Sequence, residues 1–133
     1  MPEQTDLPQW GIVNSWLPSL REHPRIWVAW LEGSLARGDA NAFSDIDIRI
    51  ALDFLGFGQF ERGDRSTLHG LGPYHISLDT DNFLRLLTED GYVIDLQVHS
   101  ADRLPQVPQG ECRVLVSYDT DGFFVIFLVI QSI

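Results

Sequence analysis

An alternating run of charged and apolar residues, 45–52, limits what this chain can fold into more than any other segment. The run reads Asp-Ile-Asp-Ile-Arg-Ile-Ala-Leu, and successive side chains of a β-strand point to opposite faces of the sheet. The three isoleucines therefore share one face, and the charged residues Asp45, Asp47 and Arg49 share the other. We predict a strand that buries its isoleucine face in a core and presents two carboxylates on the opposite face.

The remaining segments predict an α/β (α+β) fold in which helices flank a small mixed sheet. Apolar residues recur at helical spacing over residues 7–23, which indicates an amphipathic helix. Apolar, β-branched and aromatic residues predict three further strands, at residues 25–31, 91–98 and 112–118. We expect a short helix over residues 81–88, and mostly loop over residues 54–72, where five glycines lie. Strands separated by helices are typical of this fold class.

Length and charge exclude several function classes. The chain has 133 residues, which suits one domain, and its formal net charge of −10 argues against broad binding of long nucleic acid. The basic residues are arginines, with no lysine in the sequence. Schiff-base chemistry, a lysine general base and a Walker-type phosphate lysine are therefore excluded.

Cysteine, histidine and targeting signals point to a cytoplasmic protein. Cys112 is the single cysteine, which excludes a disulfide framework, and the four histidines lack the spacing of zinc ligands. The N-terminus does not resemble a signal peptide. The longest apolar run, residues 123–130, is far shorter than the ~20 residues of a membrane-spanning helix.

The two aspartates of the alternating run predict a cation site. Asp45 and Asp47 project from one face of the predicted strand and repel each other, and Mg²⁺ is typically held by one or two carboxylates together with substrate phosphates. Gly33 and Ser34 lie upstream, between a predicted strand and a helical turn, where backbone N–H groups can form an anion nest. A phosphate cradle beside a carboxylate pair indicates metal-assisted nucleotidyl or phosphoryl transfer.

The order of these residues resembles the signature of the DNA polymerase β-like nucleotidyltransferase superfamily. That signature is a Gly-Ser after a strand, about ten residues, and Asp-x-Asp on the next strand; here residues 35–44 separate Ser34 from Asp45. The segments Gly-Ser-Leu-Ala-Arg-Gly and Ser-Asp-Ile-Asp-Ile are similar to those of small bacterial members of the superfamily, the minimal and antibiotic-type nucleotidyltransferases. The resemblance covers roughly residues 25–118 and implies a polymerase-β-like palm.

The resemblance implies transfer of a nucleoside monophosphate, AMP from ATP, to a hydroxyl of a small molecule or protein. Asp45 and Asp47 would bind the Mg²⁺ that carries the triphosphate, and Asp95 would complete a second Mg²⁺ site. Gly33 and Ser34 would hold the phosphates. Two other acids, Asp79 and Asp81, also lie downstream and are alternatives to Asp95 as the third carboxylate.

Two arginines are further candidates for the nucleotide site. Arg37 follows the Gly-Ser pair, and would either contact the nucleotide phosphates or lie on a helix surface. Arg49 continues the face of the two aspartates, and would either pair with their carboxylates or reach a phosphate.

Two other functions remain open at this stage. The chain resembles antitoxin-like or regulatory partners of HEPN-type proteins, and it could also be a truncated nucleotide-binding domain without activity. Residues 119–133 form an apolar tail, which a buried strand, a partner surface or a shortened reading frame would each explain. We expect the tail to be covered, by a second copy of the chain or by a helical partner protein.

Overall fold

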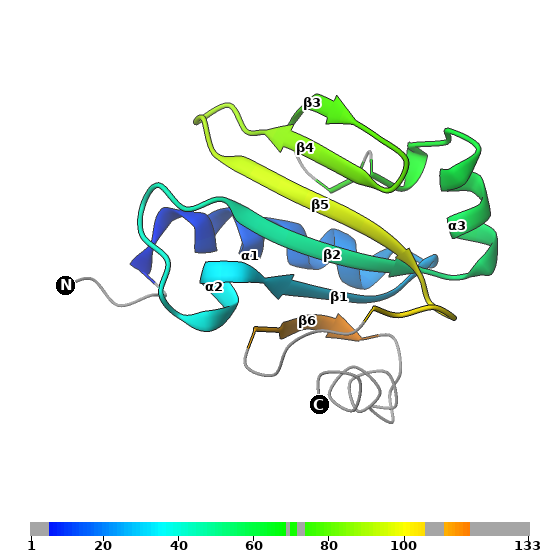
Figure 1. Cartoon of the computed structure of the whole chain (residues 1–133), viewed down its shortest axis with the longest axis horizontal. Coiled ribbons are helices and arrows are strands. Elements are labelled where there is room, and N and C mark those ends of the chain that lie inside the picture. Colours follow the sequence, from blue (N-terminus) through cyan, green and yellow to red (C-terminus); the bar gives the residue numbers. More distant parts are fainter. Residues whose placement is uncertain (1–5, 69, 72–73, 106–110, 118–133) are drawn as a thin grey trace.

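Six strands form one mixed sheet in the order β3-β4-β5-β2-β1-β6 (Figure 1). The computed structural model describes residues 6–68, 70–71, 74–105 and 111–117. The strands are Ile26–Glu32 (β1), Ile46–Leu52 (β2), His75–Asp79 (β3), Phe83–Leu87 (β4), Val93–Ser100 (β5) and Arg113–Ser117 (β6). β2 and β5 are parallel, and the other neighbouring pairs are antiparallel. The prediction of a small mixed sheet is confirmed.

The described residues also form three α-helices: Pro8–Glu22 (α1), Gly33–Arg37 (α2) and Phe54–Glu61 (α3). A short 3-10 helix, Ser66–Leu68 (η2), follows α3. The predicted helix over residues 7–23 is confirmed by α1, and the predicted strands are confirmed by β1, β2, β5 and β6 within about two residues at each end. No helix in the described ranges is long and apolar enough to cross a membrane.

The isoleucine face of β2 is the centre of the core, as the alternation predicts. Ile46, Ile48 and Ile50 are fully buried, in one cluster with Trp16 of α1 and Phe60 of α3. Burying side chains of this size stabilises the fold by about 1.5–3 kcal/mol each. The face that carries Asp47 and Arg49 is thereby directed away from the main core.

The predicted helix over residues 81–88 is wrong, because this segment forms strand β4. Leu84 and Leu86 are buried, Arg85 between them is exposed, and β4 pairs with both β3 and β5. The short segment has apolar residues that fit either period, and its pairing on both sides decides for the strand.

The loop predicted over residues 54–72 is wrong for its first half, which is α3. Asp53 caps this helix, since its carboxylate accepts a hydrogen bond of 2.7 Å from the Gly56 N–H. Gly56 packs so closely on Arg25 that an added Cβ would lie 2.9 Å from the Arg25 Cβ. The glycine therefore serves helix packing rather than a loop. The predictions for the tail, residues 119–133, lie outside the described residues.

Substitutions of Asp53 separate the contributions of the α3 cap and of the ion pair with Arg25 to the free energy of unfolding. Its second oxygen lies 3.0 Å from Arg25 Nη1. We expect Asp53→Ala to lower the free energy of unfolding by about 1–2 kcal/mol, because it removes a cap and an ion pair that is partly solvated. Asp53→Asn keeps the capping oxygen and should cost less than about 1 kcal/mol in urea unfolding followed by tryptophan fluorescence. Equal losses in the two variants would show that the cap contributes nothing.

Candidate active site

Four charged residues form one row across the face of the sheet opposite the isoleucines. Glu32 of β1 is the register partner of Asp47 of β2, Asp47 is the partner of Asp95 of β5, and Arg85 of β4 is the partner of Asp95. Side chains at paired positions of adjacent strands share a face. We call Glu32, Asp47, Asp95 and Arg85 the charged row; three of its four members are acids.

The charged row settles which downstream carboxylate lies beside Asp47. Asp95 is its direct partner on the parallel strand. Asp79 is instead on the exposed strand β3, where it pairs with Arg65 at 2.8 Å, and Asp81 is exposed between β3 and β4. The structure therefore brings Asp95, and neither of the two alternatives, next to the predicted aspartate pair.

Asp47 is the central carboxylate of the row and has no hydrogen bond or ion pair within the described part of the chain. Partial burial raises the pKa of its carboxyl; the charge of Arg49 lowers that pKa, and the charges of Asp95, Asp45 and Glu32 raise it again. Asp45, directly before β2, is exposed and likewise has no such partner among the described residues. An unpaired carboxylate surrounded by acids is a position where a bound cation would stabilise the ionised form.

Gly33 lies against the Asp47 carboxylate at the junction of β1 and α2. An added Cβ at position 33 would overlap Asp47 Oδ2, and the φ angle of Gly33 is +71°. Ser34 follows in the first turn of α2, and its carbonyl accepts hydrogen bonds of 3.0 and 3.1 Å from the N–H groups of Gly38 and Asp39. The predicted phosphate cradle and the predicted metal carboxylate are thus neighbours.

Asp95 is 9% exposed and is paired with Arg85. Arg85 Nε donates to Asp95 Oδ1 at 2.9 Å, and Nη2 lies 3.4 Å from Oδ2. The guanidinium is the counter-ion that a nearly buried carboxylate needs. No group of three or more His, Cys, Asp or Glu side chains in the described ranges is placed to hold a metal ion.

Arg49 is held at the other end of the row. Arg49 Nε lies 3.2 Å from Glu32 Oε2, and Arg49 Nη1 lies 3.4 Å from the Asp95 carbonyl oxygen. Glu32 Oε2 also accepts a 2.9 Å hydrogen bond from the Trp30 indole. Of the two predicted roles, the structure shows pairing with a carboxylate, although the partner is Glu32 rather than either predicted aspartate.

Arg37 lies at the end of α2 and is engaged by other acids. It forms ion pairs with Asp39 at 3.3 Å and with Glu111 at 3.7 Å, and it is partly exposed. Neither of these acids belongs to the charged row, so the structure does not join Arg37 to the aspartate pair.

Glu32 and Arg85 were not predicted as site residues. For Arg85 the available signal was the alternation of Leu84, Arg85 and Leu86, which fits a strand with a charged outer face. Glu32 ends the first strand directly before the Gly-Ser pair, and its place depends on the register of β1 on β2. A single sequence carries no comparable signal for that register.

His99 lies farther along the same face and is stacked on Trp30, with ring centroids 5.7 Å apart. Its Nε2 is buried and makes no hydrogen bond to the described residues. Burial, assisted by the charge of Arg49, lowers the pKa of His99 to about 4. This histidine is neutral at pH 7 and contributes packing.

Gly33 and Gly38 form a matched pair for testing the close approach to Asp47. Both have positive φ angles, +71° and +86°, but a Cβ at position 38 would meet nothing within 4 Å. We expect Gly38→Ala to lower the free energy of unfolding by about 1 kcal/mol through backbone strain, and Gly33→Ala to cost at least about 1 kcal/mol more. The excess should disappear when Asp47→Ala is added, in a double-mutant cycle. Equal costs for the two glycines would contradict the close approach.

The lowered pKa of His99 predicts that the folded protein loses stability as the pH falls. Between pH 6.5 and 4 the unfolded chain takes up a proton at this residue that the folded chain does not, so its contribution to stability falls as the pH falls through this range. We expect His99→Phe, which retains an aromatic ring beside Trp30, to lose less stability than the unsubstituted protein from pH 7 to pH 4.5. Parallel pH dependences in urea unfolding would show that His99 titrates normally.

The sequence was also compared with known proteins. No protein-family model and no curated protein matches it. Any function assigned to the chain therefore depends on the residues and geometry described above.

Proposed function

We propose that this chain is a Mg²⁺-dependent nucleotidyltransferase with a polymerase-β-like palm, which transfers AMP from ATP to a hydroxyl of a small molecule or protein. The observation that carries the proposal is the environment of Asp47: a partly buried carboxylate without a partner among the described residues, with the backbone of Gly33 against it and Asp95 beside it. The order of strand, Gly-Ser turn, helix and Asp-x-Asp strand is the order that the sequence resemblance implies.

The donor set fits Mg²⁺ in part. Asp45 and Asp47 supply the oxygen ligands that Mg²⁺ prefers, and their oxygens are not engaged by other described residues. Asp95 is the register partner of Asp47 on the adjacent strand, but its oxygens are paired with Arg85, and the three carboxylates do not form a metal-holding group in this arrangement of the described residues. We therefore assign the first ion to Asp45 and Asp47, and a second ion to a state in which Arg85 has left Asp95.

In the proposed reaction the acceptor hydroxyl oxygen attacks the α-phosphorus of ATP. The bond from this phosphorus to the bridging oxygen breaks, pyrophosphate leaves, and the hydroxyl proton passes to a carboxylate or to water. Mg²⁺, when bound, would neutralise phosphate charge and lower the pKa of the acceptor hydroxyl. Asp45 and Asp47 would hold the ion, the backbone N–H groups of Gly33 and Ser34 would hold a phosphate, and Asp95 would accept the proton once it is free of Arg85.

Arg85 would affect this reaction differently in two positions of its side chain. Its side chain is 46% exposed, so it can turn from Asp95 toward solvent without breaking core packing. It would then place a positive charge near the triphosphate, where negative charge develops on the leaving pyrophosphate. While it remains on Asp95, it neutralises that carboxylate and opposes a second cation.

The Arg85–Asp95 pair also favours one alternative function, a nucleotide-binding domain without transferase activity. A domain in which Asp95 stays paired would bind a nucleotide through Asp45, Asp47 and Gly33, but would lack the third carboxylate for transfer. Incubation with ATP labelled at the α-phosphate, Mg²⁺, and a panel of hydroxyl acceptors that includes the protein itself separates the two functions. Labelled acceptor and released pyrophosphate indicate a transferase, and binding without transfer indicates a nucleotide-binding domain.

Asp47→Asn tests the assignment of the central carboxylate. We expect this variant to lose Mg²⁺-dependent ATP binding by at least about tenfold in calorimetric titration, because an amide cannot replace a charged ligand of a hard cation. Asp81→Asn is the matched control, since Asp81 is an exposed acid outside the charged row, and it should bind as the unsubstituted protein does. Circular dichroism should show both variants folded. Retained Mg²⁺-dependent binding in Asp47→Asn would contradict the proposal.

A further inference from the structure

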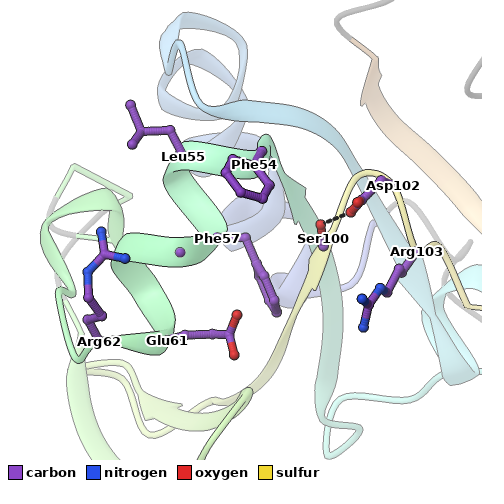
Figure 2. A pocket seen from close by; sticks show the side chains of 9 residues that line it. Phe54, Leu55, Phe57, Glu61, Arg62, Ser100, Asp102 and Arg103 are labelled. Atoms are coloured by element: carbon purple, nitrogen blue, oxygen red, sulfur yellow. Dashed lines mark hydrogen bonds between the residues drawn. The ribbon is translucent and has the colours of Figure 1, made fainter.

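A cavity of about 260 Å³ lies at the carboxyl ends of β2 and β5, between α3 and the turn that follows β5 (Figure 2). These strands are the parallel pair of the sheet, and Leu52 and Ser100 are their last paired residues. Ligands of open α/β sheets commonly bind outside the carboxyl ends of parallel strands. The volume is near the lower end of the range for small-molecule sites, which indicates a small ligand.

The cavity is separate from the charged row. Leu52 lies five positions after Asp47 along β2, and Ser100 lies five positions after Asp95 along β5. At about 3.3 Å per residue the two ends are roughly 16 Å apart. Figure 1 shows α2, which begins at Gly33, and α3 at opposite ends of β2.

Aromatic side chains of α3 form one wall of the cavity. Phe57 is half-buried and directed toward the cavity, whereas Phe54 at its mouth is 87% exposed (Figure 2). A phenyl ring left in water forgoes about 1.5–3 kcal/mol of burial free energy. These rings offer a surface for an apolar group of a ligand.

Charged side chains of both signs lie on each side of the cavity: Glu61 and Arg62 at the end of α3, and Asp102 and Arg103 in the turn after β5. Figure 2 shows Glu61 directed toward the cavity and the Arg62 guanidinium on the other side of α3. Glu61 of α3 has no hydrogen-bond or ion-pair partner within the described ranges. Arg103, in the turn after β5, lies across the cavity from α3 (Figure 2), and it forms no ion pair within 4.0 Å with any described residue. The two charges thus face one cavity without pairing with each other.

The turn that carries Arg103 is held in place. The Arg103 N–H donates to the Ser100 carbonyl at 3.0 Å, and the buried Ser100 hydroxyl donates to the Asp102 carboxylate. This hydrogen bond lowers the pKa of Asp102, which therefore stays ionised beside Arg103. The turn therefore fixes the backbone of Arg103, and its exposed guanidinium is available to a ligand.

We propose that this cavity binds a small zwitterion with an apolar side chain, the chemical class of a free α-amino acid. The ligand ammonium would pair with Glu61, its carboxylate would receive the planar fork of Arg103, and its side chain would pack on Phe57 and Phe54. Asp102 is engaged by the Ser100 hydroxyl, and Arg62 is directed away from the cavity, so Glu61 and Arg103 offer one charge of each sign to a ligand from two sides. This site needs neither phosphate nor metal, so it stands apart from the proposed nucleotide site.

Three probes test the proposal on the full chain: L-phenylalanine, 2-phenylethylamine, which lacks the carboxylate, and 3-phenylpropanoate, which lacks the ammonium. Binding is measured by ligand-observed NMR without nucleotide or Mg²⁺. We expect L-phenylalanine to bind about tenfold more tightly than either single-charge probe, because each removed charge loses one charge-assisted interaction.

Two variants assign the charges. Glu61→Gln should weaken L-phenylalanine and 2-phenylethylamine about tenfold and leave 3-phenylpropanoate unchanged, whereas Arg103→Gln should weaken L-phenylalanine and 3-phenylpropanoate and spare the amine. Glu89→Gln, at an exposed acid outside this cavity, is the control and should change none of them. The proposal is overturned by the absence of saturable binding of all three probes, by an amine or acid that binds as tightly as L-phenylalanine, or by variants that affect all probes equally.

Discussion

The parallel pairing of β2 with β5 is the interaction on which the rest of the structure depends. Its register buries the isoleucines of β2 beside Ile94, Leu96 and Val98 of β5. The same register necessarily places Asp47 beside Asp95 on the other face, and like charges on adjacent strands repel. The free energy of burying the apolar face offsets this repulsion, so the acids can be kept together for a purpose other than stability.

The charged row limits this repulsion at its two ends and leaves its centre unneutralised. Arg85 pairs with Asp95 on one side, and Arg49 pairs with Glu32 on the other. Asp47, between them, has no ion-pair partner in the described part of the chain, and the close approach of Gly33 leaves no room for a side chain at position 33. A cation that arrives with a polyanionic ligand would complete this arrangement, which is why nucleotide transfer is the function that we propose.

The sequence was sufficient to predict β2 and its charged face, because period-two alternation is a local signal. Asp95 was a candidate only through the resemblance, beside Asp79 and Asp81, and the register of β5 on β2 is what distinguishes it. The sequence was insufficient for Arg85, since the short segment 81–88 fits a helix as well as a strand until its pairing with β3 and β5 is known. Glu32 enters the row only through the register of β1 on β2. The helix α3 was missed because its two internal glycines are typical of loops, whereas one of them is required by packing on Arg25.

In the proposed function, the unpaired carboxylates beside Gly33 bind a divalent cation together with a nucleotide. Anomalous X-ray diffraction from crystals grown with Mn²⁺ and a non-hydrolysable ATP analogue tests it most directly. We predict an anomalous peak within coordination distance of Asp47, about 2.0–2.3 Å from its oxygen, with the phosphates next to the backbone of Gly33. Nucleotide and metal bound elsewhere, or a Mn²⁺ peak absent from Asp45 and Asp47 at saturating concentration, would contradict it.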